Sequence, residues 1–280
     1  MRLAANHRTK TLNNKEFKRL QELAHRFSGI KMSEDKRDLL YNRLVKRVDS
    51  LSLSTFDQYC DHLEAHGDEE QIFVNSITTN LTSFFREQHH FDMLAQSVFP
   101  DVLTKNNDTR RLRIWSAGCS TGEEPYSIAM TVREHIPDTA GYDVRILATD
   151  LDTEVLEKCR KGVYVEERIE SLSPMQKKRF FQRGTGKNSG TVRAKRELRD
   201  MITFKQLNLL EEWPMSGPFD IIFCRNVVIY FDKDTQRRLF ARYAQLMAPN
   251  GYLFIGHSES LFKVSEEFKL LGNTAYQRAA

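Results

Sequence analysis

The chain has 280 residues, of which 40% are hydrophobic and 29% are charged, so it has the composition of a globular protein with room for one large and one smaller domain. Its net charge of +4 is too small to indicate nucleic-acid binding by itself. No stretch approaches the roughly 18 apolar residues of a membrane span, and the N-terminus lacks the apolar core of a secretory signal. We therefore expect a cytoplasmic protein without membrane insertion.

Helical patterns alone account for the first ninety residues. Apolar side chains recur at helical spacing from Phe17 to Phe27, and Gly29 ends that run. Further helices are expected over residues 35–48, 54–65 and 69–79. No strand pattern precedes residue 111, so we expect an all-helical domain over residues 1–90 and a linker over 91–110.

Charge is distributed unevenly in this N-terminal part. Residues 1–48 hold 13 Lys or Arg against 5 Asp or Glu, whereas residues 49–85 hold no Lys or Arg against 7 Asp or Glu. The first fifty residues therefore carry a surplus of positive charge that the rest of this part does not.

Short apolar runs alternate with amphipathic helical patterns after residue 111. Strands are expected over residues 112–116, 144–149, 202–207, 220–224 and 252–256, with a last strand within 268–277. Helices are expected between them over residues 124–135, 153–161 and 233–247. This alternation predicts an α/β domain over residues 111–280, built on a doubly wound, parallel sheet with helices on both faces.

One stretch before the strand at Ile202 interrupts the alternation. It holds a glycine-rich turn at residues 184–190, followed by the basic run Thr191–Arg199. We expect a small inserted β-subdomain over about residues 175–201. The first six residues of the basic run are expected to form an exposed edge strand.

Glycine or polar residues follow four of the predicted strands. In a parallel α/β sheet, ligands bind beyond the carboxyl ends of the strands. Gly118 and Gly122 follow the first strand and would let a ligand approach the backbone, and Asp150 ends the second, where an acidic side chain commonly binds a ribose. The other two strands are followed by Asn208-Leu209 and Arg225-Asn226. Together these residues predict a site for an adenosine-containing ligand.

Each of these features also has a plainer interpretation. A glycine-containing turn often only closes a tight loop, and Asp150 or Asp152 would serve as the N-cap of the following helix. Four successive strand ends of this kind nevertheless favour a ligand site over loop polarity.

The sequence offers no obvious acid–base or metal chemistry. No nucleophilic serine or cysteine–histidine pair stands out, and the four cysteines are scattered as reduced thiols usually are. The adjacent His89 and His90 would point about 100° apart on a helix, which disfavours a shared metal ion. An adenosine site without such groups suits methyl transfer, because S-adenosylmethionine brings its own activated methyl group.

Five segments, taken in order, resemble the CheR family of chemotaxis methyltransferases. They are Thr79–Glu87, Ser120–Ser127, Ala148–Asp152, Phe223–Phe231 and Gly256–Glu259. The resemblance extends from about residue 15 to residue 277. It implies a helical N-terminal domain, a class I S-adenosylmethionine-dependent methyltransferase sheet and a small inserted β-subdomain.

The resemblance also implies which residues hold the cofactor. Asn80, Thr82 and Arg86 would reach it from the N-terminal side, Glu124 would lie by its methionine end, and Asp150 would bind its ribose. Gly118, Asn208, Leu209, Arg225 and Asn226 would complete the site. Helix capping by Asn80 and Thr82 and an ion pair of Arg86 with Glu87 or Glu123 are the plain alternatives.

The family reaction transfers a methyl group from S-adenosylmethionine to the γ-carboxylate of receptor glutamates, giving glutamyl methyl esters and S-adenosylhomocysteine. A glutamate with a pKa of about 4.3 is ionised at neutral pH, so it needs no catalytic base. Arg86 and Tyr230 are the candidates to orient that carboxylate. Packing in the core is the alternative for Tyr230.

The partners implied by the family are methyl-accepting chemotaxis receptors. On a helix, Lys36, Arg43 and Arg47 would share one face, which could be a solvated surface or could bind the acidic receptor helices. In some members the β-subdomain binds a peptide at the receptor C-terminus, for which Arg193 and Arg196 are the candidates. We expect a monomer.

Two rival functions remain open at this stage. A nucleic-acid methyltransferase would usually show Asn-Pro-Pro-Tyr or Asp-Pro-Pro-Tyr after the fourth strand, whereas Asn226 and Tyr230 are separated here by Val-Val-Ile. A non-catalytic receptor scaffold that merely holds the cofactor is the other. The sequence therefore favours a protein methyltransferase and predicts neither a nucleic-acid partner nor a metal.

Overall fold

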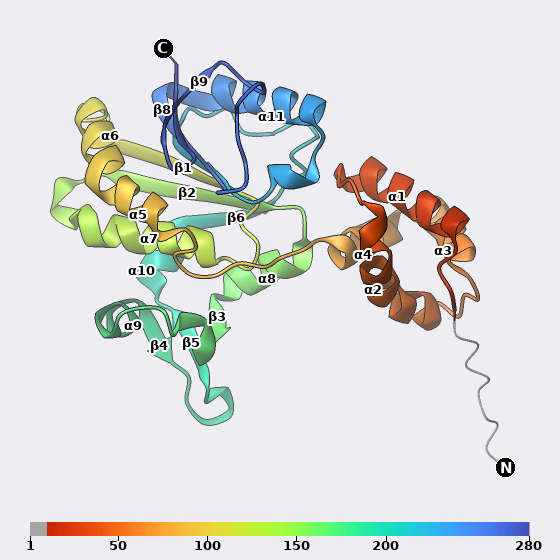
Figure 1. The fold of residues 1–280 in the computed structure, drawn as a ribbon. Coiled ribbons are helices and arrows are strands. Elements are labelled where there is room, and N and C mark those ends of the chain that lie inside the picture. The colour runs from red at the N-terminus through yellow and green to blue at the C-terminus, as the bar shows by residue number, and fades with distance from the viewer. Residues whose placement is uncertain (1–9, 280) are drawn as a thin grey trace. The chain divides into compact units, whose positions relative to one another are not determined.

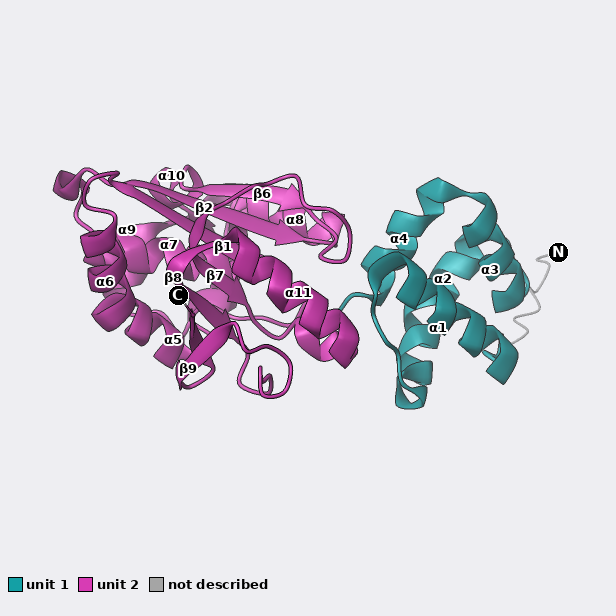
Figure 2. Cartoon of the chain, turned by 90° about the horizontal axis from the view of Figure 1, so that it is seen from above, with its two compact units in different colours: residues 1–79 teal, residues 80–280 magenta. Residues whose placement is uncertain are grey.

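The computed structural model describes residues 10–279, and the chain divides into two compact units, residues 1–79 and 80–280 (Figure 2). Each unit has its own hydrophobic core. No helix among the described residues is both long and apolar enough to cross a membrane.

The described part of the N-terminal unit is helical (Figure 1). Its elements are α1 (Asn14–Ser28), the 3-10 helix η1 (Glu34–Lys36), α2 (Arg37–Ser50), α3 (Phe56–Ala65) and α4 (Gly67–Ile77). Asn13 and Glu16 form a reciprocal capping box at the start of α1, and Gly29 ends the helix in the left-handed conformation with φ of 69°. The expected helix end at Gly29 is therefore confirmed.

Ion pairs within this unit join the basic first half of its sequence to the acidic second half. Arg19 of α1 donates to Asp57 at 2.6 Å and to Asp61 at 2.7 Å, both on α3. Arg47 of α2 donates to the buried Glu69 of α4 at 2.8 Å. Residues 1–79 hold thirteen Lys or Arg against twelve Asp or Glu, a net charge of +1. Much of the predicted basic surplus is thus neutralised inside the unit.

The second unit contains a seven-stranded sheet in the order β6-β2-β1-β7-β8-β10-β9. Its strands are β1 (Arg111–Ala117), β2 (Asp143–Asp150), β6 (Ile202–Gln206), β7 (Phe219–Cys224), β8 (Met247–Ile255), β9 (Phe268–Gly272) and β10 (Ala275–Arg278). Strands β6, β2, β1, β7 and β8 are parallel, which confirms the predicted doubly wound sheet. The segment expected to hold a single last strand forms the antiparallel pair β9 and β10, because residues 272–274 turn the chain with positive φ angles.

Alternating side chains of each strand face two separate cores. Ile114 and Phe223 pack on one face of the sheet, with α7 (Glu123–His135), and their neighbours Trp115 and Cys224 pack on the other, with α11 (Lys233–Leu246). The first face is also covered by α5 (Gln88–Met93), the π-helix η2 (Leu94–Val98) and α6 (Phe99–Lys105) (Figure 1). Most of the segment expected as a linker is therefore helical, since its apolar side chains are needed in this core.

A small antiparallel sheet follows α8 (Thr153–Lys161). It consists of β3 (Val163–Val165), β5 (Thr191–Ala194) and β4 (Phe181–Arg183) in the order β3-β5-β4, with the short helices η4 (Glu166–Ile169), α9 (Pro174–Phe180) and α10 (Arg196–Arg199) around it. The prediction that residues 191–196 form an edge strand is wrong. β5 is the central strand, and the chain has entered α10 by Arg196. The error arose because β3 is only three residues long and directly follows a helix, too short to be read from sequence.

Candidate active site at the carboxyl edge of the sheet

The carboxyl ends of four parallel neighbours, β6, β2, β1 and β7, meet at one edge of the large sheet. The connections that leave these ends contain the predicted residues Asn208, Asp150, Gly118 and Asn226, one on each strand's exit. Parallel pairing thus brings together residues that are more than one hundred positions apart in the sequence.

The turn after β1 requires glycine at two positions. Gly118 has φ of 90°, and a Cβ atom there would lie 2.4 Å from Cγ2 of Val227. Gly122 has φ of 97° and is the N-cap of α7, where a Cβ atom would lie 2.8 Å from the Tyr164 hydroxyl. Both the backbone conformation and the lack of space exclude larger residues, so the turn presents bare backbone at the sheet edge.

Asp150 and Asp152 have different tasks. The carboxylate of Asp152 accepts the N–H groups of Glu154 and Val155 and caps α8, which leaves Asp150 free of that role. Asp150 accepts the N–H of Ser120 at 2.7 Å and that of Asp152 at 3.0 Å. Burial raises the pKa of Asp150 to about 6, although both N–H groups act in the opposite direction.

The segment from Asn80 to Glu87 is tied to this edge. Asn80 Nδ2 donates to Asp152 at 2.7 Å, and the Ser120 hydroxyl donates to the Asn80 carbonyl at 2.9 Å. The N–H of Phe85 donates to the Ser127 hydroxyl of α7 at 2.9 Å. Asn80, for which helix capping was the plain alternative, therefore contacts the loop after β2.

Arg86 does not form either of the predicted ion pairs within the described part of the chain. Its guanidinium donates to the Leu81 carbonyl at 2.9 Å. The two glutamates expected to pair with Arg86 instead pair with other arginines, Glu87 with Arg225 and Glu123 with Arg168.

Arg225 lies between two carboxylates in the interior. Its guanidinium is 3.2 Å from Oε2 of Glu87 and 3.1 Å from Oε2 of Glu124, and it also donates to the Arg86 carbonyl. The Arg225 side chain is 2% exposed. Burial raises the pKa of Glu124, whereas for Glu87 the effect of burial is outweighed by His257 and Arg225, and the pKa falls to about 2. This network joins the 80–87 segment to α7 and to the end of β7.

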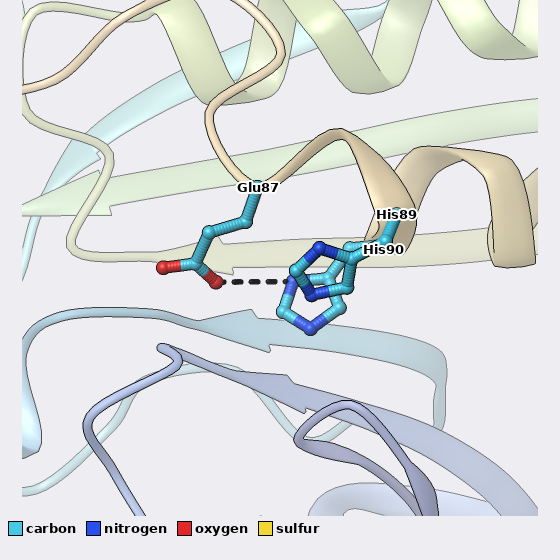
Figure 3. A group of neighbouring side chains, drawn as sticks. All are labelled: Glu87, His89 and His90. Atoms are coloured by element: carbon cyan, nitrogen blue, oxygen red, sulfur yellow. Dashed lines mark ion pairs between the residues drawn. The ribbon is translucent and has the colours of Figure 1, made fainter.

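Glu87, His89 and His90 bring potential metal ligands within 4.8 Å of one another (Figure 3). The His90 ring is 3.4 Å from Glu87 Oε2, and its other nitrogen lies 2.6 Å from the Asn273 carbonyl. The Arg225 guanidinium already lies 3.2 Å from the same Glu87 oxygen and would repel a metal cation. We therefore assign the Glu87 carboxylate to Arg225 and to His257, whose Nδ1 is 2.9 Å away.

The loops after β6 and β7 are shaped by local hydrogen bonds. Asn208 accepts the N–H of Leu210 at 3.0 Å, and the neighbouring Leu209 is buried. Asn226 has φ of 59°, and its N–H donates to Glu259 at 2.9 Å. Tyr230 lies just beyond, at the end of the 3-10 helix η6 (Val228–Tyr230), and is itself half-buried.

The sequence does not predict the partners of four residues that support this edge. Glu87 and Glu259 lie within segments that carried the resemblance, but a motif does not reveal that one pairs with Arg225 and the other accepts backbone N–H groups after β7 and β8. Glu123 and Arg168 form a pair across 45 residues. No spacing rule predicts such a partner.

The basic residues expected to bind substrate lie outside this edge. In the N-terminal unit, Arg43 donates to the Ile77 and Thr78 carbonyls at the end of α4, and Lys36 is exposed. Near the small sheet, Arg193 donates to the Lys161 carbonyl at 3.2 Å, and Arg196 pairs with Asp200 at 2.9 Å.

Comparison with known proteins covers nearly the whole chain. Residues 15–78 match the family model "CheR methyltransferase, all-alpha domain", and residues 80–277 match "CheR methyltransferase, SAM binding domain". The chain is 46% identical to the chemotaxis protein methyltransferase of Escherichia coli over 95% of this chain and 91% of that protein. It is 47% identical to chemotaxis protein methyltransferase 2 of Pseudomonas aeruginosa over 94% of this chain and 93% of that protein.

These matches identify S-adenosylmethionine as the cofactor, and the carboxyl edge fits it. Gly118 and Asp150 are both only half-buried at this edge, where backbone and carboxylate could meet the ribose of the cofactor. The expected cofactor residues Asn80 and Asp150 lie on segments that are hydrogen-bonded to the same turn.

Asp150 should make cofactor binding pH-dependent. If Asp150 binds the ribose as expected, donation by the ribose hydroxyls to the ionised carboxylate would favour its charged form, whereas the free protein holds this pKa at about 6. We expect affinity for S-adenosylhomocysteine to be constant above pH 7 and to fall up to about tenfold per unit below pH 6. Asp150→Asn should weaken binding by roughly 1–3 kcal/mol at pH 7.5 and abolish this dependence. Calorimetry between pH 5 and 8 tests both; a variant that keeps the wild-type profile would contradict the assignment.

Proposed function

We propose that this chain, which belongs to the CheR methyltransferase family, transfers the methyl group of S-adenosylmethionine to γ-carboxylates of glutamates in the cytoplasmic helices of methyl-accepting chemotaxis receptors. The products are glutamyl methyl esters and S-adenosylhomocysteine, and the reaction serves adaptation in bacterial chemotaxis. The protein would act in the cytoplasm as a monomer.

The observation that carries this proposal is the convergence of the family's motif residues on one sheet edge. Gly118, Asp150 and Asn226 come from three neighbouring strands, and the Asn80–Glu87 segment is hydrogen-bonded beside them. A chain that had lost its cofactor site would have no reason to keep Arg225 buried between two carboxylates at that edge.

The cofactor would be held by residues of all four strand exits. Asp150 would accept from the ribose hydroxyls, and the Gly118 turn would approach the cofactor through its backbone. Glu124 would lie by the methionine end, where the buried Arg225 supports it from the interior and does not itself reach the adenosine side as expected from the sequence. Asn208, Leu209 and Asn226 would lie on the adenosine side, and Asn80, Thr82 and Arg86 would approach from the N-terminal segment. When bound, the cofactor supplies a methyl group that is already activated by a positively charged sulfur.

The protein's own contribution is to position the acceptor. The receptor glutamate is ionised at neutral pH and lacks only desolvation and alignment, which can be worth about 7–11 kcal/mol. We propose that Arg86 and Tyr230 orient this carboxylate. Arg86 is held by a neutral carbonyl of Leu81 and not by a carboxylate, which leaves its charge available for a substrate.

Direct transfer of labelled methyl groups tests the function. With S-adenosylmethionine labelled in the methyl group and receptor-containing membranes, we expect label on the receptors that base treatment releases as methanol. Asp150→Asn should transfer little label at limiting cofactor. A non-catalytic scaffold would leave the receptors unlabelled, and a nucleic-acid methyltransferase would label added nucleic acid instead; either result would refute the proposal.

Receptor helices rich in glutamate would meet the positive face formed by Lys36, Arg43 and Arg47. Arg43 and Arg47 also hold α4 in place, through the Ile77 carbonyl and the Glu69 carboxylate respectively. Lys36 is therefore the position at which receptor binding and stability can be separated.

We expect Lys36→Glu to slow receptor methylation several-fold at low ionic strength, and less at high salt, without changing affinity for S-adenosylhomocysteine. Lys46→Glu, an exposed lysine of the same region, is the control. If Lys36→Glu and Lys46→Glu methylate receptors at equal rates at low salt, the proposal that the positive face binds receptors is wrong.

Arg47→Ala should instead lower the free energy of unfolding by about 2–3 kcal/mol, because it leaves the buried Glu69 without its cation, although water can partly replace the lost guanidinium.

We further propose that the small sheet binds a receptor C-terminal peptide at the free edge of β4. A pocket of about 720 Å³ lies beside that strand and is lined by Phe181, Arg183, Val192 and residues of η4 and α9. An aromatic side chain of the peptide would fit the apolar part of this pocket. Arg183 would meet its acidic groups; Arg193 and Arg196, the contacts expected from the sequence, do not line this pocket, since Arg193 lies opposite Gln182 on the other face of the sheet and Arg196 is in α10.

Peptides corresponding to receptor C-termini should bind with micromolar affinity in calorimetry. Arg183→Glu should weaken peptide binding at least tenfold, whereas Val165→Glu, on the opposite edge strand β3, should leave peptide binding unchanged. Neither change should alter cofactor affinity. If the peptides give no binding heat and do not compete with receptors, the proposed peptide site is refuted. If only Val165→Glu loses peptide binding, the peptide binds at β3.

A further inference from the structure

Arg168 connects the small sheet to two segments of the cofactor site. It lies in η4, directly after β3. Its Nε donates to Oε1 of Glu123 at 2.9 Å, and its Nη2 donates both to that oxygen and, at 2.8 Å, to the carbonyl of Thr82. One guanidinium therefore holds the first turn of α7 and the 80–87 segment at the same time.

Hydrogen bonds of Glu123 connect Arg168 to the glycine-containing turn. Its side chain is fully buried, and its second carboxylate oxygen accepts the Thr121 hydroxyl at 2.6 Å. Its backbone carbonyl accepts the Ser127 hydroxyl at 2.6 Å, which in turn accepts the N–H of Phe85. The turn after β1, the start of α7 and the 80–87 segment thus share one hydrogen-bond network, to which Arg168 supplies the cation.

Tyr164 of β3 makes a second contact from the small sheet to the same turn. Its hydroxyl donates to the Thr121 carbonyl at 2.9 Å, and its ring packs edge-on against Phe84 with 5.1 Å between centroids. The Tyr164 hydroxyl is also the atom that leaves no room for a side chain at Gly122. Tyr164 and Arg168 therefore contact both cofactor-binding segments from one side.

We propose that Arg168 and Tyr164 are positioning residues for the cofactor site, through which the small sheet holds the Gly118–Gly122 turn and the 80–87 segment in the arrangement that binds S-adenosylmethionine. The inference rests on the proposed function. Without Arg168, the Glu123 carboxylate would be buried without its cation, and the Thr82 carbonyl would lose a donor. Part of the population would then leave the binding arrangement, and apparent affinity would fall by that fraction.

This role differs measurably from simple stabilisation of the fold. A residue that only stabilises would lower the melting temperature of the free protein and leave the affinity of the folded molecules unchanged. A positioning residue raises the dissociation constant for S-adenosylhomocysteine and the KM for S-adenosylmethionine, while kcat at saturating cofactor changes little.

The test compares Arg168→Ala, Arg168→Lys and Tyr164→Phe with Arg237→Ala, which removes an arginine paired with Asp234 on the surface of α11. Calorimetry gives the dissociation constant for S-adenosylhomocysteine, thermal melting gives the stability of the free protein, and receptor methylation gives KM and kcat. We expect Arg168→Ala to weaken binding at least tenfold and Tyr164→Phe about threefold or more. Arg168→Lys should rescue in part, since lysine restores the charge but not the fork that reaches both acceptors.

Unchanged affinity in folded Arg168→Ala overturns the inference. If that variant does not fold, Arg168→Lys and Tyr164→Phe decide: weaker binding at an unchanged melting temperature supports it, and wild-type binding overturns it. Arg237→Ala should stay within twofold of wild type in every measurement. A wild-type protein that fails to bind S-adenosylhomocysteine would refute the proposed function itself, an outcome distinct from equal binding by wild type and variants.

Discussion

The Arg225 guanidinium carries its charge in the interior of the second unit, where it is stable only between the carboxylates of Glu87 and Glu124. Each of the three ions would cost several kcal/mol to bury alone, so they must be buried together. They come from the end of β7, the start of α7 and the segment before α5. Their mutual neutralisation therefore fixes the relative positions of three chain segments at the carboxyl edge of the sheet. The other contacts of the site, including those of Asp150 and Asn80, are built on that arrangement.

Such rigidity suits a reaction in which the protein supplies no acid or base. In the proposed reaction both reactants are already activated, the cofactor by its sulfonium and the acceptor glutamate by its ionisation, so the remaining barrier would be mainly that of alignment and desolvation. Alignment is lost when the supporting residues shift by a fraction of an ångström. Buried ion pairs and backbone hydrogen bonds, such as those that Glu259 accepts from the Asn226 and Gly256 N–H groups, resist shifts of that size.

The sequence predicted what depends on local pattern and missed what depends on distant partners. The alternation of short apolar runs with helical patterns after residue 111 predicted the doubly wound sheet, and the structure shows the consequence at Ile114 and Trp115, which face different cores. The sequence could not predict the strand order of the small sheet, since the three residues of β3 are too few to show an alternation of buried and exposed side chains. It could not choose between Asp150 and Asp152 as the helix cap; the hydrogen bonds from Glu154 and Val155 decide for Asp152. Motif resemblance named Arg225 and Glu124, but it did not predict that Arg225 pairs with Glu124 and with Glu87, which lie 101 and 138 positions away.

Charge pattern is the least informative of these signals, and the N-terminal unit shows why. Thirteen basic residues lie in its first half, yet Arg19 alone pairs with Asp57, Asp61 and Glu64 of the same unit. The surplus left over residues 1–79 is +1. Net attraction of the unit for an acidic helix is therefore weak, and any steering of receptors has to come from the arrangement of individual cations. A lysine that remains exposed, such as Lys36, contributes to that field, whereas Arg47 is neutralised locally by Glu69. The proposed recognition of receptors by this unit would then depend on shape and on a few placed charges, and single substitutions would affect it more than they would affect a uniformly basic surface.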